Sequence, residues 1–460
     1  MVVLLKIIQV ILALSLLVLF HEFGHYTFAK LFKTRVEKFY LFFNPKRSLF
    51  KCKRFGGKWH CKFFSSNDDP DFDAHPENTE YGIGWLPFGG YCKIAGMIDE
   101  SMDTEAMKQP PQPYEFRTKK AWQRFFIMFG GVLFNFILAI ILYAAILGTW
   151  GEEYLRNEDA VYGVAVNDLS YEIGFRDGDR ILAFDGVPVE NFSNLQVDLV
   201  RSQAREATVL RDGDTVTVAV DPVYLPAMLN TPGMFDLAFP FVVKEVSADS
   251  PNLDAGLEPG DALEGIDGQR MFIVQQIQKE LLKHKEGQVT ASVRRDQREL
   301  ELPLQVDTAG HIGVLLDTDV NKYFHVTTRD YNLLSAIPAG ARKTWTTIKG
   351  YVQELGLIFS PKTQAYKSVG SFIAIGRIFP DTWDWFRFWT LCALLSIMLG
   401  VMNLLPIPAL DGGHILFLIF EMITGRRPSD KFMEVAEWIG MALLILLMVL
   451  AFGNDIRSLF

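Results

Sequence analysis

Three ionisable side chains, His21, Glu22 and His25, stand together at the end of an apolar run that begins at Val2. On a helix, residues four apart project from one face, so the two imidazoles could bind one metal ion. Glu22 could act on a water molecule at that metal without being a ligand. A charged group at bilayer depth costs about 2.5–3.5 kcal/mol on insertion scales, and coordination by neutral histidines would explain the motif's position. The pattern predicts a metal site inside a membrane.

A second motif, Asn403-Leu-Leu-Pro-Ile-Pro-Ala-Leu-Asp-Gly-Gly-His414, interrupts another apolar stretch. Its two prolines and two glycines must break a helix, and the Asp411 carboxylate should not face lipid. Broken membrane helices usually border a cavity or a binding site, because their free backbone groups need partners. The motif therefore predicts a discontinuous helix with a site at the break.

Four apolar stretches are long enough to cross a bilayer. We expect a polytopic α-helical membrane protein with helices at residues 1–31, 124–150, 385–424 and 433–453, and a cytoplasmic region at 32–123. A cleaved signal peptide ending near Phe20 is the alternative for the first stretch. No small-residue cleavage site follows Phe20, which argues against that alternative.

Composition narrows the classes of partner. The 460 residues carry a net charge of −9 without a basic block, so nucleic acid is not an expected partner. The positive mean hydropathy of +0.15 suits a protein with both membrane and soluble parts. Four cysteines without paired spacing argue against a disulfide framework. A second metal site at Cys52, His60, Cys61 and His75 is one alternative, and ordinary reduced thiols are the other.

Residues 81–96 are too apolar for a solvated loop and too rich in glycine for a membrane helix. Their alternation predicts a glycine-kinked β-hairpin, and non-helical backbone at membrane depth is tolerated only beside protein or a cavity. An ordinary surface hairpin is the alternative.

The middle of the chain contains a repeat, in which Gly174-Phe-Arg-Asp-Gly-Asp recurs 82 residues later as Gly256-Leu-Glu-Pro-Gly-Asp. The two copies, at residues 158–222 and 237–307, resemble tandem PDZ domains. That resemblance implies mixed α+β folds whose exposed strand edge can bind a peptide. Apolar residues at helical spacing then predict an amphipathic helix at 332–359, lying on the membrane surface or packed onto the PDZ pair. Flanking basic residues predict that both termini and the PDZ pair face outward.

Together these motifs resemble the bacterial site-2 proteases of the regulator-of-sigma-E type. The resemblance implies an intramembrane zinc endopeptidase of the inner membrane that cleaves single-span membrane proteins, such as trimmed anti-sigma factors or remnant signal peptides. It implies one Zn²⁺ ion held by His21, His25 and Asp411, with Glu22 as the general base. It also implies that Asn403 binds the substrate, and that Gly84, Gly89 and Gly90 do so within a membrane-reentrant β-loop.

Some alternatives stay open, and two positions depart from the family pattern. His414 is the rival third ligand. The family's Gly-Pro is replaced by Gly131-Val132 and by Ser371-Phe372. We expect neither position to touch the metal motifs, so substrate docking is affected more than catalysis. A non-catalytic PDZ scaffold with a structural zinc is the main alternative function. A PDZ-bearing serine protease would need a Gly-x-Ser-x-Gly motif, which the sequence lacks.

Overall fold

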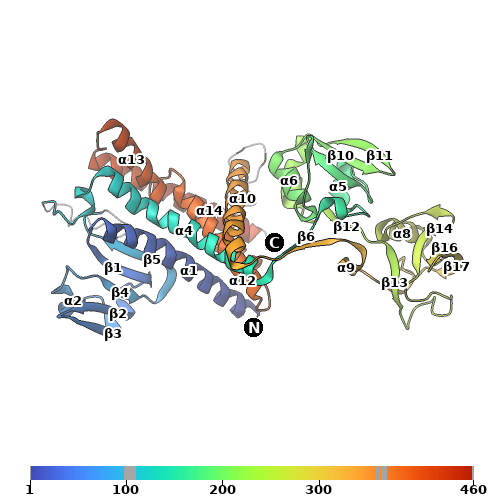
Figure 1. Cartoon of the computed structure of the whole chain (residues 1–460), viewed down its shortest axis with the longest axis horizontal. Coiled ribbons are helices and arrows are strands. Elements are labelled where there is room, and N and C mark those ends of the chain that lie inside the picture. Colours follow the sequence, from blue (N-terminus) through green and yellow to red (C-terminus); the bar gives the residue numbers. More distant parts are fainter. Residues whose placement is uncertain (1, 98–109, 359, 361–362, 364–369, 458–460) are drawn as a thin grey trace. The chain divides into compact units, whose positions relative to one another are not determined.

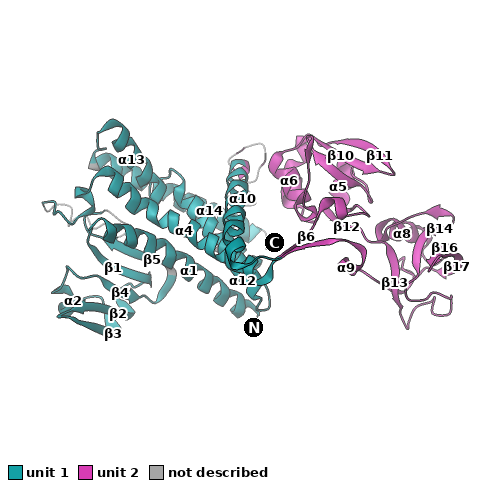
Figure 2. Cartoon of the chain, in the orientation of Figure 1, with its two compact units in different colours: residues 1–151, 330–356, 369–460 teal, residues 152–329, 357–368 magenta. Residues whose placement is uncertain are grey.

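The structure is a computed structural model that describes residues 2–97, 110–358, 360, 363 and 370–457. It separates into two compact units (Figure 2). The first contains residues 1–151, 330–356 and 369–460, and the second contains residues 152–329 and 357–368. Each unit is described separately below.

Long apolar helices build the first unit (Figure 1). They are α1 (Val2–Leu31), α4 (Ala121–Trp150), α12 (Trp385–Leu404) and α14 (Asp430–Arg457), with the shorter α13 (Asp411–Thr424) between the last two. In the described residues, α1, α4, α12 and most of α14 are long and apolar enough to cross a membrane. These helices confirm the expected polytopic membrane class.

Glycines let α1 and α4 approach closely. A Cβ atom at Gly24 would collide with the carbonyl oxygen of Gly130, and one at Gly130 would lie 2.6 Å from the carbonyl oxygen of Gly24. Small residues at a crossing let two backbones touch, which is the usual basis of helix packing in lipid. The crossing lies within the metal motif of α1, so α4 passes directly beside the two histidines.

The interruption between α12 and α13 spans Leu405 to Leu410. Gly412 and Gly413 pack against the backbone of this turn, and Gly440 of α14 packs against the Pro408 carbonyl, at distances that leave no room for side chains. The turn is therefore clamped from both sides. Asp411 becomes the first residue of α13, where a carboxylate is favoured by the helix dipole.

A five-stranded sheet follows α1, in the order β3-β2-β4-β1-β5. Its strands are β1 (Val36–Phe43), β2 (Arg47–Phe55), β3 (Lys58–Ser66), β4 (Glu80–Ile83) and β5 (Leu86–Ile94), with the short α2 (Pro70–Asp73) after β3 and a 3₁₀ turn, η1 (Phe116–Thr118), before α4. The hairpin prediction for residues 81–96 is wrong, because β4 pairs parallel with β1 while β5 pairs antiparallel with its other edge. Gly84 and Gly89 make this crossing possible: a Cβ at Gly84 would collide with the Phe43 carbonyl, and one at Gly89 would lie 2.7 Å from the Phe43 ring.

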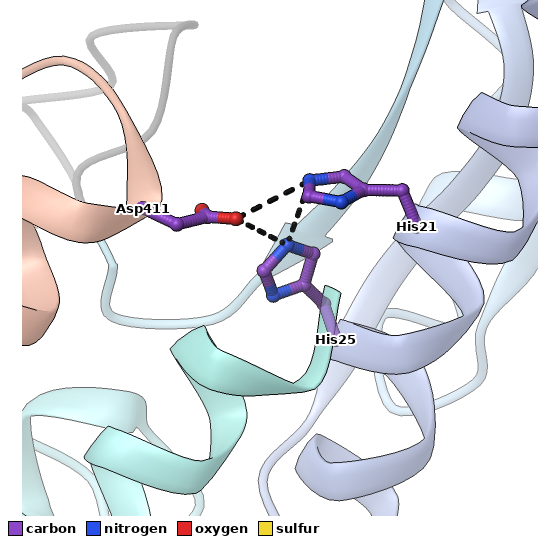
Figure 3. Close-up of side chains that lie close together, drawn as sticks. All are labelled: His21, His25 and Asp411. Atoms are coloured by element: carbon purple, nitrogen blue, oxygen red, sulfur yellow. Dashed lines mark hydrogen bonds and ion pairs between the residues drawn. The ribbon is translucent and has the colours of Figure 1, made fainter. Parts of the chain in front are cut away.

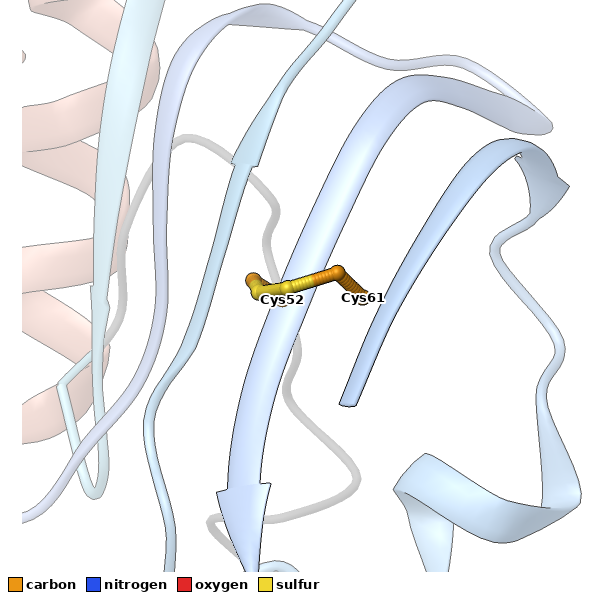
Figure 4. Close-up of a disulfide and its surroundings, with 2 residues drawn as sticks. All are labelled: Cys52 and Cys61. Carbon is orange, nitrogen blue, oxygen red and sulfur yellow. A yellow bond between two sulfur atoms is a disulfide. The ribbon is translucent and has the colours of Figure 1, made fainter. Parts of the chain in front are cut away.

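Cys52 and Cys61 form a disulfide between β2 and β3 (Figure 4). The two residues are directly opposite each other in the antiparallel register, with Cα atoms 4.2 Å apart. This corrects both expectations for these residues, a second metal site and reduced thiols. His60 and His75 instead stack on the ring of Phe55.

The amphipathic helix predicted at 332–359 corresponds to α10 (Leu333–Ile358); residue 359 lies outside the described residues. Gly340 packs against the α4 backbone at Ala144, while Leu334 and Trp345 remain 83% and 57% exposed. The helix thus touches the bundle on one side and leaves apolar side chains uncovered on another. The short α11 (Phe372–Ile378) begins after Ser371, whose hydroxyl and N–H donate to Asp455 of α14.

The second unit contains the repeat in two sheets that share part of their order. The first is β11-β10-β8-β9, and the second is β17-β16-β14-β13-β18 with β15 paired to β14. The first half comprises β6 (Glu152–Leu155), η2 (Asn157–Asp159), β7 (Val164–Val166), α5 (Asp168–Ile173), β8 (Arg180–Phe184), β9 (Val187–Pro188), η3 (Phe192–Asn194), α6 (Leu195–Ser202), β10 (Glu206–Arg211), β11 (Asp214–Ala219), η4 (Pro222–Tyr224), α7 (Leu225–Asn230) and β12 (Phe235–Leu237). The second comprises β13 (Phe241–Val246), β14 (Ala262–Ile266), β15 (Gln269–Arg270), α8 (Val274–Leu281), η5 (Leu282–His284), β16 (Gln288–Arg295), β17 (Arg298–Gln305), β18 (Val314–Leu316), α9 (Val320–Tyr323) and β19 (Val326–Arg329), which returns to pair with β6.

Equivalent ion pairs mark the two copies. Asp179 pairs with Arg211 in the first, and Asp261 pairs with Arg295 in the second, and both carboxylates are fully buried. Each copy also has its own apolar core. The repeat in the sequence is therefore a repeat of folded modules.

Candidate metal centre

His21, His25 and Asp411 converge in the membrane unit (Figure 3). Nε2 of His21 lies 3.3 Å from Nε2 of His25 and 3.3 Å from Oδ2 of Asp411. Nε2 of His25 lies 3.4 Å from the same carboxylate oxygen. The three atoms thus form a nearly equilateral triangle, in which α1 supplies two corners and the first residue of α13 supplies the third.

The triangle fits a zinc ion. Tetrahedral zinc holds nitrogen and oxygen ligands at about 2.0–2.2 Å, which places neighbouring ligand atoms about 3.4 Å apart. Oδ2 of Asp411 is buried and has no hydrogen-bond partner among the described residues. A buried carboxylate oxygen without a donor needs a cation, because desolvated charge is costly. Two imidazoles and one carboxylate are also a common donor set of catalytic zinc sites.

Asp411 and His414 lie differently with respect to the two histidines. Within the described chain, the group that could hold a metal contains His21, His25 and Asp411, and His414 is not part of it. His414 instead lines the cavity beside the triangle.

The face of α4 that meets α1 holds both histidine rings. Nδ1 of His25 lies 2.9 Å from the carbonyl oxygen of Ile127, and Nδ1 of His21 lies 3.1 Å from the side-chain amide of Asn135. Between these two partners, a Cβ at Gly131 would collide with Nε2 of His25 and lie 2.6 Å from Cε1 of His21. The expectation that position 131 does not touch the metal motif is therefore wrong. Asn135 was not among the site residues expected from the sequence, because helical spacing does not show which face of α4 meets α1.

A cavity of about 530 Å³ opens beside the triangle. Glu22 lines it together with the three converging residues, and residues 90–94 of β5 form one of its walls. Glu437, an ionisable residue of the apolar helix α14, also faces it and was missed in the sequence because nothing there relates α14 to α1. The Glu22 side chain and the extended backbone of β5 therefore border the same cavity.

The residues expected to bind substrate divide into two pairs. Nδ2 of Asn403 lies 3.4 Å from Nε2 of His21, and Gly90 lines the cavity. Gly84 and Gly89 instead pack tightly against Phe43, where their missing side chains allow the chain to cross the end of β1.

Comparison with known proteins agrees with this geometry. Residues 9–65 and 72–447 match the model of peptidase family M50. The chain belongs to this family. Its membership confirms the resemblance to site-2 proteases and makes the protein a metalloprotease, and the family implies a zinc cofactor. A serine protease is thereby excluded.

Relatives of this M50 peptidase match it over nearly their whole length. A "Putative zinc metalloprotease" of Xylella fastidiosa (strain 9a5c) is 27% identical over 470 residues, covering 97% of each chain. The "Regulator of sigma-E protease RseP" of Salmonella typhimurium (strain 14028s / SGSC 2262) is 28% identical over 476 residues, covering 98% of each chain. A "Putative zinc metalloprotease" of Treponema pallidum (strain Nichols) is 28% identical over 477 residues, covering 99% of each chain.

Proposed function

We propose that this protein is an intramembrane zinc endopeptidase that cleaves the transmembrane segments of single-span membrane proteins, such as trimmed anti-sigma factors or remnant signal peptides. One observation carries the proposal: three ligand atoms with tetrahedral spacing and a neighbouring carboxylate, Glu22, share a cavity formed by apolar helices. A structural zinc site would have its coordination closed by protein, whereas this triangle faces a cavity with room for a substrate.

The proposed roles follow from where each group lies. His21, His25 and Asp411 would hold one zinc ion, which when bound polarises a peptide carbonyl and makes water more acidic. Glu22 accepts the proton of the attacking water and passes it to the amine of the departing peptide. The side chains of His21 and His25 are buried, so water screens the electrostatic interactions at this site only weakly.

The substrate would bind as an extended strand along β5. Strand β5 stands last in the order of the described strands, next to β1, and its residues 90–94 line the cavity. A peptide bond in a helix is shielded by its own hydrogen bond, so a transmembrane segment must unwind before attack. Pairing with β5 would replace the lost helical hydrogen bonds. Asn403 would hold the unwound segment near His21, and the β4–β5 region would act as the membrane-reentrant loop.

We place the protein in the bacterial inner membrane, with residues 32–123 in the cytoplasm and both termini on the outer side. The distribution of basic residues along the sequence supports this orientation. The uncovered apolar side chains of α10, including Leu334 and Trp345, support a helix lying at the membrane surface.

The two repeats would act on the outer side as PDZ domains that exclude substrates with large folded outer domains. Their separate apolar cores support modules that fold independently of each other. Deleting residues 160–307 should let untrimmed substrate be cut. A folded, zinc-loaded deletion variant that still requires prior trimming would place the filter elsewhere.

Replacing Glu22 tests the function itself. Glu22→Gln keeps the size of the side chain and removes its basicity, and Glu22 lies outside the ligand triangle. The variant should therefore retain zinc while cleavage of a membrane peptide falls by about 10²–10⁴-fold. Zinc content and cleavage are measured on the same purified samples. Unchanged cleavage would refute the mechanism, and absence of cleavage in the zinc-loaded parent would favour the scaffold alternative.

A further inference from the structure

The two histidines each have a second ring nitrogen that faces away from Asp411, and both of these nitrogens meet α4. The partner of His25 is the Ile127 carbonyl oxygen, at 2.9 Å, and the partner of His21 is the Asn135 amide, at 3.1 Å. Ile127, Gly131 and Asn135 follow one another at intervals of four residues, so they share one helix face. On that face Ile127 and Asn135 each contact one histidine ring, and Gly131 between them leaves room for both rings.

A histidine that binds metal through Nε2 is neutral and carries its proton on Nδ1. His25 then donates this proton to the Ile127 carbonyl, which is a satisfied hydrogen bond. His21 needs an acceptor at the same place. The amide of Asn135 presents Nδ2 there, while its Oδ1 is buried without a partner. A half-turn of the amide exchanges the two atoms and brings Oδ1 to Nδ1 of His21 as an acceptor.

Asn135 can therefore serve both forms of His21. With Nδ2 towards the ring, it donates to an unprotonated Nδ1. With Oδ1 towards the ring, it accepts from a protonated Nδ1 and leaves Nε2 free for metal. Groups of this kind orient metal-binding histidines, and their loss typically lowers metal affinity.

We propose that Asn135 is a positioning residue that holds the His21 ring with Nε2 turned to the metal. The inference rests on the metal site proposed above and adds a residue that contacts neither the metal nor the substrate. Its full burial supports the assignment, because an amide in an apolar span is costly unless it has a specific partner.

The surroundings of Asn135 provide a matched control. Its backbone carbonyl accepts a hydrogen bond of 2.8 Å from the Ser396 hydroxyl of α12, and this contact does not involve a histidine. Ser396→Ala therefore disturbs the packing of α4 against α12 at the same residue while it leaves the side chain of Asn135 on His21. A purely structural role for this position would make the two variants alike.

The experiment measures zinc release from the purified full chain into excess chelator. Asn135→Leu should release zinc about 10–100-fold faster than the parent, whereas Ser396→Ala should match the parent. Asn135→Asp should restore slow release, because a carboxylate accepts the Nδ1 proton. The visible spectrum of the Co²⁺-substituted protein should change in Asn135→Leu and stay unchanged in Ser396→Ala, since it reports the ligands directly.

The outcomes separate this inference from the proposed function. A parent chain without bound zinc or cleavage would refute the proposed function. A zinc-loaded, active parent with equally slow release from Asn135→Leu would overturn only the role of Asn135, and so would equal acceleration in Ser396→Ala. If Asn135→Leu loses the helix content of the parent, Asn135→Ala replaces it, and parent-like release from that folded variant overturns the inference.

Discussion

Oδ2 of Asp411 lies 3.3 Å from Nε2 of His21, although one residue begins α13 near the end of the chain and the other lies in its first helix. The interruption before α13 makes this approach possible. In a continuous helix, the residue at this position would lie farther along the axis of α12. The turn at Leu405–Leu410, held by close backbone contacts, instead places the start of α13 opposite α1. The proline- and glycine-rich motif therefore determines where Asp411 meets the two histidines.

The assignment of Asp411 over His414 can be tested by metal analysis. Asp411→Ala should lose most of its zinc, because it removes one of three protein ligands, while His414→Ala should retain it. Metal content per protein is measured on purified variants with parent-like helix content. Full zinc in Asp411→Ala together with loss in His414→Ala would show that the third ligand is His414.

Gly131→Ala should weaken metal binding without removing a ligand. The added methyl group would collide with the His25 ring and displace both imidazoles from the triangle. We expect zinc affinity to fall about 10–100-fold, as for loss of a group that orients a ligand, and cleavage to fall with it. Gly148→Ala is the control on the same helix, since its Cβ would lie 3.6 Å from its nearest neighbour, the Cβ of Ala336. Normal zinc affinity in Gly131→Ala would mean that the rings tolerate this displacement.

The disulfide and the proposed orientation can be tested together. Cytosolic proteins rarely keep disulfides, so a Cys52–Cys61 disulfide that resists alkylation in intact cells would argue against a cytoplasmic position for residues 32–123. In a background lacking Cys52, Cys61 and Cys92, a membrane-impermeant reagent added outside should label Ser202→Cys and spare Lys58→Cys. Both positions are exposed. Labelling of Lys58→Cys alone would reverse the orientation.

The buried ion pair of the second repeat predicts a pH dependence. Burial by itself raises the pKa of Asp261, but hydrogen bonds from Arg295 and from the Glu258 N–H outweigh it and lower that pKa. A lowered pKa stabilises the fold fully above the unfolded value of about 3.9, and this contribution is lost as the pH falls through the folded value.

Asp261→Asn should therefore destabilise this repeat by about 1–3 kcal/mol at pH 7, and the difference from the parent should shrink in acid. Amide hydrogen exchange of β14 and β16 in the full chain, compared at equal pH, measures the change. Asp296→Asn replaces an exposed carboxylate next to Arg295 and should leave exchange unchanged. An equal effect of the two substitutions would rule out the buried pair as the cause.

The sequence by itself predicted the features that depend on neighbours along the chain. Apolar length predicted the four membrane helices, and the spacing of His21 and His25 placed both imidazoles on one helix face. The proline and glycine pattern predicted the interrupted third helix, and self-similarity predicted the two modules. Each of these follows from local geometry, which the order of residues specifies directly.

Only the tertiary structure decided which distant groups meet. Helical spacing says nothing about which face of α4 crosses α1, so the contacts of Gly131 and Asn135 with the histidines could not be inferred. The alternation of residues 81–96 was correctly interpreted as strands, but pairing depends on the partner, and β1 lies between them. The register of β2 and β3 places Cys52 opposite Cys61, and the spacing of the two residues in the sequence does not indicate this pairing. Asp411 and His414 are equally suitable ligands by type, and the sequence could not show that Oδ2 of Asp411 lies 3.3 Å from Nε2 of His21 and 3.4 Å from Nε2 of His25.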